Sequence, residues 1–138
     1  MSVSELCPIC GSRIPSGSQV CPICGALISR VSLPTGTKLK GRYTIGKVLG
    51  QGGFGITYKG GDTILSRVVA IKELFPEGCT RNQRTVQPTR PDVQAEYPHI
   101  KQRFMEEARL LARLNHPGVV RVYDFFEENN TAYMIMEL

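Results

Sequence analysis

The stretch LGQGGFGITYKGGDTILSRVVAIK, residues 49–72, decides the fold of this chain. Gly50, Gly52 and Gly55 stand at the spacing G-x-G-x-x-G, which two different folds use. In a dinucleotide-binding fold these glycines lead straight into a helix. Here they lead into ITYK, residues 56–59, whose β-branched and aromatic side chains favour a strand. The spacing therefore predicts a glycine loop between two strands.

A further predicted strand, VVAI at residues 68–71, follows the glycine pair at 60–61 and ends on Lys72. Glycines let backbone N–H groups approach a polyphosphate without interference from a Cβ atom, and a lysine ammonium group adds a point charge. The combination indicates phosphate binding. A glycine-rich hairpin with a surface lysine is the alternative interpretation of the same residues.

Strand patterns also lie upstream and downstream of this stretch. A strand-like alternation begins at Leu39 and continues through Tyr43, Ile45, Lys47 and Leu49, which we take as a first strand that enters the glycine loop. Two runs, VVRVYDFF at 119–126 and TAYMIMEL at 131–138, flank the turn EENN at residues 127–130. This arrangement is typical of a hairpin.

Residues 100–114, IKQRFMEEARLLARL, have helical periodicity. At 100° per residue one face carries Ile100, Phe104, Ala108, Leu111 and Leu114. Glu107 falls within that face and Glu106 points away from it. Because a carboxylate on a buried face needs a cationic partner, we predict an ion pair between Glu107 and Lys72. Arg103 and Arg109 are the alternative partners within the helix, and residues 115–118 end it.

After ELFPEG at residues 73–78, the chain is polar to about His99 and contains Pro88, Pro91 and Pro98. The segment is longer than an ordinary connection, so we expect an irregular insertion, most simply a solvated loop and alternatively a segment that docks a partner.

Two C-P-I-C-G units near the start of the chain contribute Cys7, Cys10, Cys21 and Cys24. The glycines that follow, Gly11 and Gly25, suit tight turns whose N–H groups point at sulfur. Four thiolates make a closed tetrahedral site for structural zinc. Two disulfides and an iron–sulfur site are the alternatives. The fifth cysteine, Cys79, is interpreted as a small loop residue.

Composition bounds the remaining possibilities. The 138 residues carry a net charge of +5 without a dense basic run, so nucleic-acid binding is not expected. The chain has neither an apolar run of about 18 residues nor a signal pattern at its start, so we expect no membrane span and a cytoplasmic location. We divide the chain into a zinc ribbon at 1–28, a linker at 29–38 and a main domain at 39–138.

The motifs LGQGGFG, VAIK, FMEEARLLARLNHPGVV and YMIMEL together resemble the N-terminal lobe of a bacterial eukaryotic-like serine/threonine protein kinase. The double-CPxCG zinc ribbon is similar to appendages of such kinases. The resemblance implies an α+β fold, with a five-stranded antiparallel sheet and one αC-type helix, that binds ATP under the glycine loop.

By this resemblance Lys72 and Glu107 are the catalytic pair, and Lys72 holds the α- and β-phosphates. Ala70 contacts adenine, Met136 is the gatekeeper and Glu137 begins the hinge. Thr57 stands where the family usually has valine. The implied cofactor-binding residues are Leu49, Gly50, Gln51, Gly52, Gly53, Phe54, Gly55, Thr57, Ala70, Lys72, Met136, Glu137 and Leu138.

The family's H-R-D catalytic loop and D-F-G magnesium motif do not occur in residues 1–138. We therefore expect the ATP-binding, N-terminal part of a kinase that acts on protein serine and threonine. Its catalytic lobe would come from the rest of the gene or from another chain, so the 138 residues alone should be inactive. The alternative function is a non-catalytic module in which the zinc ribbon and the lobe bind a partner protein.

Overall fold

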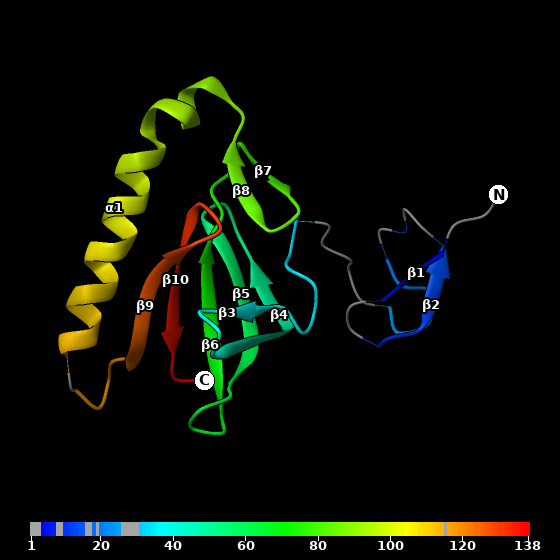
Figure 1. The fold of residues 1–138 in the computed structure, drawn as a ribbon, viewed down its shortest axis with the longest axis horizontal. Helices are drawn as coiled ribbons and strands as arrows, with labels where there is room; N and C mark the ends of the chain where they lie inside the picture. Colours follow the sequence, from blue (N-terminus) through cyan, green and yellow to red (C-terminus); the bar gives the residue numbers. More distant parts are fainter. Residues whose placement is uncertain (1–3, 8–9, 16–17, 19, 26–30, 115) are drawn as a thin grey trace.

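A computed structural model describes residues 4–7, 10–15, 18, 20–25, 31–114 and 116–138. Its main feature is an antiparallel sheet in the order β3-β4-β5-β6-β10-β9, flanked by one long helix, α1 (Figure 1). The five expected strands are all present, and the two-residue β3 extends the sheet by one. The predicted α+β fold with one helix is confirmed.

The strands run through the segments that the sequence pattern indicated. Their bounds are Lys38–Leu39 (β3), Tyr43–Gln51 (β4), Gly55–Asp62 (β5), Arg67–Leu74 (β6), Val122–Glu128 (β9) and Thr131–Met136 (β10). The turn between β9 and β10 consists of Asn129 and Asn130, both with positive φ. Asparagine tolerates this conformation in a two-residue hairpin turn, so the predicted hairpin is confirmed.

The sheet is strongly curled, and the curl brings its two ends, β3–β4 and β9, into contact. Tyr43 in β4 donates a hydrogen bond to Asp124 in β9 (2.7 Å), and Lys40 binds the same oxygen (3.0 Å). The ring of Phe126 stacks between Tyr43 and Tyr133, with centroid separations of 5.9 and 5.5 Å. Burial alone would raise the pKa of Asp124, but the bonds from Tyr43 and Lys40 lower it.

Two hydrophobic clusters fill the lobe. The first gathers inside the curl and contains Leu33, Leu39, Tyr43, Ile45, Ile56, Tyr58, Val69, Ile71, Phe75, Val86, Tyr97, Tyr133 and Ile135. The second lies between α1 and the sheet and contains Leu74, Phe104, Ala108, Val122, Ala132 and Met134. Successive residues of β6 point to opposite faces, so this strand contributes to both clusters.

The expectation of an irregular segment from residue 79 to about His99 is wrong. Residues Cys79–Asn82 (β7) and Thr85–Pro88 (β8) form an antiparallel hairpin, and α1 extends over Pro91–Arg113, nine residues earlier than predicted. Pro91 occupies the start of the helix, where a missing N–H costs nothing. Pro98 lies inside the helix, so prolines that suggested irregular structure are here accommodated within a regular element.

The β7–β8 hairpin is docked on the lobe. The Val86 N–H donates to the carbonyl of Asn129 (2.9 Å), and the Asn130 side chain donates to the carbonyl of Val86 (2.9 Å). Tyr97 in α1 donates to the carbonyl of Asn130 (2.6 Å). The insertion thus connects the start of α1 to the β9–β10 turn, and these contacts within the chain replace the expected solvated loop.

Residues 31–38, assigned to the linker by composition, contact the sheet. Leu33 is buried in the first cluster, and its N–H donates to the hydroxyl of Tyr58 (3.0 Å). The backbone at Gly36 and Thr37 pairs with Ile45. The predicted boundary between the zinc ribbon and the linker, at 28–29, and the helix-ending residue at 115 lie outside the described residues.

Asp62 closes the turn between β5 and β6. Its fully buried carboxylate accepts two hydrogen bonds from Arg42 (2.9 and 2.8 Å) and two from the backbone N–H groups of Ile64 and Leu65 (3.0 and 3.1 Å). The bonds from Arg42 are the main cause that lowers the pKa of Asp62 to about 2. The charged carboxylate therefore stabilises the folded lobe.

We expect Asp62→Asn to lower the free energy of unfolding by about 1–3 kcal/mol near neutral pH. A depressed folded-state pKa contributes stability above the unfolded pKa of about 4, and this stability disappears as the pH falls toward about 2. The difference between wild type and variant should therefore shrink across that window. Denaturant unfolding at several pH values measures it, and a difference that does not change with pH would contradict the assignment.

Candidate functional site

The glycine loop joins β4 to β5, and its glycines differ in what the fold requires of them. A Cβ atom at Gly55 would lie 2.3 Å from the backbone oxygen of Glu73, so the close approach of β5 to β6 requires glycine there. A Cβ atom at Gly50, Gly52 or Gly53 would meet nothing within 4 Å, and none of the three has positive φ. The described residues therefore give no packing reason for these three glycines, which leaves room for a ligand.

Lys72 is positioned by the centre of the sheet. It lies in β6 opposite Thr57 in β5 and Met134 in β10. Its half-buried side chain lines a cavity of about 320 Å³ between the sheet and α1. The lining residues are Phe54, Lys72, Leu74, Ile100, Arg103, Phe104 and Glu107. Lys72 thus shares one cavity with Phe54 of the glycine loop and with the helix.

Glu107 lies on the helix face that the periodicity indicated, because it lines this cavity and Glu106 does not. Glu107 is nevertheless exposed, so it does not need a cationic partner as a buried carboxylate would. Within the described part of the chain, no ion pair within 4.0 Å joins it to Lys72, Arg103 or Arg109. The expected contact between Lys72 and Glu107 is therefore not made in this structure. Leu114, also expected on the buried face, is 49% exposed at the helix end.

The residues that the resemblance assigns to adenine lie in neighbouring strands. Ala70 is buried in β6 and pairs with Met136 at the end of β10. Leu49 and Phe54 are exposed, at 46% and 77%, in or beside the glycine loop. The N–H of Glu137 donates to the carbonyl of Arg121 (2.9 Å), and Leu138 is exposed.

A second hollow, of about 500 Å³, lies where α1 ends. Its lining residues are Leu114, His116, Pro117, Val119, Arg121 and Glu137. Although it is larger than the cavity at Lys72, it shares only Glu137 with the predicted nucleotide residues. We therefore place the candidate site at the smaller cavity, which combines the glycine loop with a lysine.

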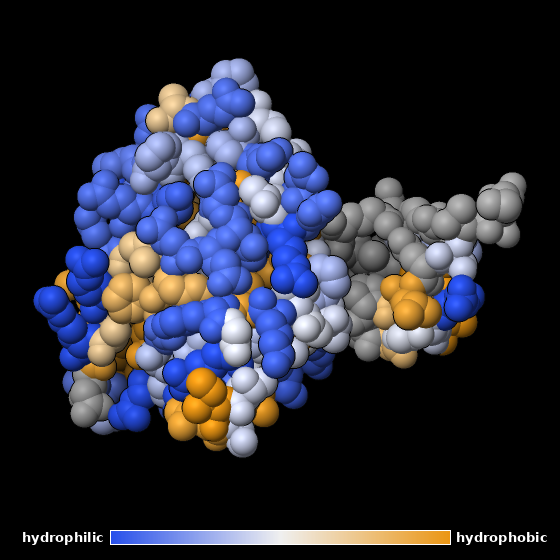
Figure 2. Space-filling model, viewed as in Figure 1, coloured by the Kyte–Doolittle hydropathy of each residue, from blue (hydrophilic) through white to orange (hydrophobic). Residues whose placement is uncertain are grey.

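The visible surface of the lobe is mainly hydrophilic (Figure 2). A group of hydrophobic atoms stands out at its lower end, where the β5–β6 turn exposes Ile64 and Leu65. No helix among the described residues is both long enough and apolar enough to cross a membrane.

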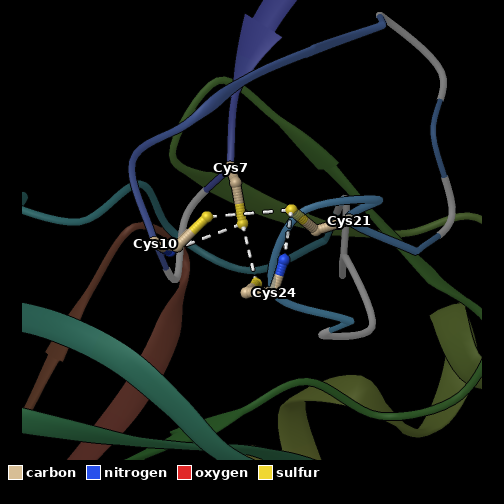
Figure 3. Close-up of side chains that lie close together, drawn as sticks. All are labelled: Cys7, Cys10, Cys21 and Cys24. Carbon is tan, nitrogen blue, oxygen red and sulfur yellow. Dashed lines mark hydrogen bonds between the residues drawn. The ribbon is translucent and has the colours of Figure 1, made fainter.

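The N-terminal unit places four cysteine sulfurs together. The short strands Ser4–Leu6 (β1) and Arg13–Pro15 (β2) pair antiparallel, and the sulfurs of Cys7, Cys10, Cys21 and Cys24 lie within 4.8 Å of one another (Figure 3). The distance between sulfurs is 3.7 Å for Cys7–Cys24 and for Cys10–Cys21. A tetrahedral site with zinc–sulfur bonds of about 2.3 Å separates its sulfurs by about 3.8 Å. The cluster thus fits zinc and is too open for disulfides, whose sulfurs lie about 2.05 Å apart.

Backbone N–H groups support the sulfurs, as the glycines predicted. The Cys10 N–H points at the sulfur of Cys7 (3.5 Å), and the N–H groups of Ile23 and Cys24 point at the sulfur of Cys21 (both 3.4 Å). Gly11 and Gly25 close the two turns at φ of 77° and 76°. Hydrogen bonding by Ser12 lowers the pKa of Cys10 to about 6, and the Cys24 N–H lowers that of Cys21. Both shifts are toward the thiolate form, which is the form that binds metal.

The comparisons with known proteins agree with this geometry. The protein kinase domain family matches residues 43–138, and the chain therefore belongs to the protein kinase family. Over 95 residues it is 39% identical to the serine/threonine-protein kinase PknD of Chlamydia pneumoniae, covering 69% of this chain and 8% of that protein. It is 36% identical over 102 residues to PrkC of Bacillus subtilis strain 168, covering 74% of this chain and 13% of that one.

A similar serine/threonine-protein kinase, PknA of Mycobacterium tuberculosis strain H37Rv, is 35% identical over 108 residues, which are 75% of this chain and 21% of PknA. Among solved structures, the apo form of PpkA-294 superposes with a TM-score of 0.73 at 38% identity. That match covers 78% of this chain and 39% of the other. The chain thus spans about a fifth or less of these three curated relatives.

Proposed function

We propose that this chain is the ATP-binding part of a kinase that transfers phosphoryl groups to serine and threonine residues of proteins. The observation that carries the proposal is the glycine loop beside Lys72. Gly50, Gly52 and Gly53 leave open space where a polyphosphate would approach the backbone, and Lys72 supplies positive charge in the adjacent cavity. Family membership supports the same chemistry.

Each candidate residue has a role in this proposal. Backbone N–H groups at the tip of the glycine loop, at Gly53 and Phe54, would bind phosphate oxygens, whereas the Gly52 N–H donates to the carbonyl of Gly55 (3.0 Å). Lys72 would bind the α- and β-phosphates. Leu49, Ala70 and Met136 would contact the adenine ring, and the backbone of Glu137 and Leu138 would form the start of the hinge. Glu107 would hold Lys72 in place once their separation closes.

Magnesium is implied by the family, but the residues present do not fit it. Glu107 is the only carboxylate among the described residues that line the cavity at Lys72. Since residues 1–138 also lack the D-F-G and H-R-D motifs, we assign neither a magnesium ligand nor a catalytic base to this chain. A further polypeptide segment would have to supply both, together with the site for the protein substrate.

We also propose that the cysteine unit is a zinc ribbon that holds one structural zinc. The closed set of four sulfurs leaves no position for a reacting water, so the metal would stabilise the fold. Thiolates remain available for zinc in a reducing compartment, and we expect the protein to function in the cytoplasm.

We expect this chain to bind ATP weakly and to transfer no phosphate above background. Lys72→Met should weaken ATP binding about tenfold or more, because a charge-assisted contact to phosphate is lost. Lys38→Met is the matched control, since Lys38 is exposed on the edge strand β3. Calorimetric titration with ATP and transfer of radiolabelled phosphate to a generic protein substrate measure the two properties.

Two results would contradict the proposal in different ways. Phosphate transfer that Lys72→Met abolishes would show that the 138 residues contain a complete catalytic site. A wild-type chain that does not bind ATP at all would favour the alternative function, a module that binds a partner protein.

A further inference from the structure

A buried carboxylate lies directly beside Lys72. Glu73 is fully buried in β6, where it pairs with Ile56 in β5 and Tyr133 in β10. Because side chains alternate along a strand, Glu73 faces the opposite side of the sheet from Lys72. A charged carboxylate in this position requires compensation by donors and a cation.

Four hydrogen bonds satisfy the Glu73 carboxylate. Arg81 donates through Nη2 to Oε1 (2.5 Å) and through Nη1 to Oε2 (3.1 Å). Tyr58 donates to Oε1 (2.8 Å) and Tyr133 to Oε2 (2.6 Å). Burial raises the pKa of both tyrosines, so their hydroxyls stay protonated as donors. The Arg81 side chain is itself only 5% exposed.

Arg81 connects three further parts of the lobe to this carboxylate. It lies in β7 and donates through Nε to the carbonyl of Val31 and through Nη1 to that of Arg84 (3.1 Å). Its guanidinium carbon lies 5.0 Å from the ring centroid of Phe75, which follows β6 and is buried in the first cluster. Arg81 therefore contacts the chain both within β6, at Glu73, and just after it, at Phe75.

The segment that follows β6, residues 75–77, contacts the tip of the glycine loop. The Phe75 N–H donates to the carbonyl of Phe54 (3.0 Å), and the Glu77 N–H donates to the carbonyl of Gly53 (2.9 Å). For the described residues, these two bonds are the only ones from the backbone of residues 52–54 to a separate segment. The position of the loop tip therefore depends on the position of residues 75–77.

We propose that Arg81 is a positioning residue for the glycine loop. By binding Glu73 and covering Phe75, it holds residues 75–77 where their N–H groups fix the carbonyls of Gly53 and Phe54. The loop is thereby held at a fixed distance from the cavity that Lys72 lines. We call this set of contacts, from Arg81 to Glu73 and Phe75 and from residues 75–77 to the glycine loop, the brace. Its importance for nucleotide binding rests on the proposed function, whereas the existence of the brace does not.

Hydrogen exchange in the full 138-residue chain tests the brace without nucleotide. In Arg81→Met, the amides of Phe75 and Glu77 should exchange about tenfold faster or more than in wild type. Arg84→Met is the matched control, because its side chain is exposed in the same hairpin and only its backbone carbonyl is used. A folded Arg81→Met protein with wild-type protection at both amides would overturn the proposal.

Arg81→Met alone leaves a buried charge and can fail to fold. The double variant Glu73→Gln, Arg81→Met removes both charges. One tyrosine hydroxyl can still donate to the amide oxygen, and the other can accept from the amide NH2 group. Faster exchange at Phe75 and Glu77 in this folded variant supports the brace, and unchanged exchange overturns it. Arg81→Lys should recover only part of the protection, because lysine cannot bind both carboxylate oxygens in a bidentate geometry.

ATP titration of the same variants tests the consequence for binding. Arg81 does not line the cavity at Lys72, yet Arg81→Met or the double variant should weaken ATP binding about tenfold, with Arg84→Met unchanged. Wild-type affinity in a variant whose amides have lost protection would overturn the positioning role. If wild type itself does not bind ATP, the proposed function fails and hydrogen exchange alone decides on the brace.

Discussion

Protein purified without added metal should hold about one zinc per chain, and chelating that zinc should unfold the cysteine unit. The buried residues described in this unit are only Cys7, Ile14 and Cys21, which is too little apolar surface to hold a fold. Zinc binding would supply on the order of 10 kcal/mol of apparent stability. Elemental analysis and amide resonances measure the result, with signals from residues 4–25 collapsing while those from 43–138 persist.

Two serine variants make this result specific. Cys24→Ser should abolish stoichiometric zinc, whereas Cys79→Ser should retain it because Cys79 lies outside the cluster. A cysteine unit that keeps its resonances after chelation, or four cysteines found in two disulfides, would show that the site is not a zinc site.

Gly55→Ala is expected to reduce the free energy of unfolding of the lobe by roughly 3 kcal/mol. The new methyl group would lie 2.3 Å from the backbone oxygen of Glu73 and 3.3 Å from its carbonyl carbon. Neither atom can rotate away as a flexible side chain would, so β5 and β6 would have to separate. Denaturant unfolding followed by circular dichroism measures the loss.

Gly52→Ala is the matched control in the same loop. A methyl group there meets nothing within 4 Å, so stability should change by less than about 1 kcal/mol, in the favourable direction. Its effect should be seen instead in weaker ATP binding. Equal destabilisation by the two substitutions would mean that the loop packs differently, and an unchanged ATP affinity in Gly52→Ala would argue against phosphate binding by the loop.

Short-range patterns predicted most of the fold. The alternation around residues 43–72 and 119–138 gave the five main strands, because each strand has its own apolar face and a recognisable turn. The two C-P-I-C-G units predicted the cysteine cluster for the same reason, since ligand spacing within each turn is local. The helix face that carries Glu107 also followed from periodicity alone.

The insertion was less predictable, because its structure depends on contacts between distant residues. Three prolines between 88 and 98 suggested irregular chain, yet Pro91 begins a helix and Pro98 lies within it. Burial of Glu73 could have been predicted from the sequence, since it shares a strand face with the buried residues Val69 and Ile71. A carboxylate there required a cation, but no local pattern identifies Arg81 as the residue that supplies it.

The separation of Lys72 and Glu107 could not be predicted from the sequence either. A helix wheel gives the direction of a side chain, whereas the distance between two elements depends on how the whole helix packs. Here Glu107 lines the same cavity as Lys72, but among the described residues no ion pair within 4.0 Å joins the two.

Pro98 lies between two parts of α1 that pack against different neighbours. On its N-terminal side, Val93 and Tyr97 are buried, and Tyr97 is bonded to the β9–β10 turn. On its C-terminal side, Phe104 packs in the separate cluster against the sheet. A rigid swing of α1 would have to unpack both ends at once. Because proline lacks the N–H that would donate to the carbonyl four residues earlier, the helix can bend more easily at Pro98. Glu107 can then move toward Lys72 while the first two turns of the helix stay in place.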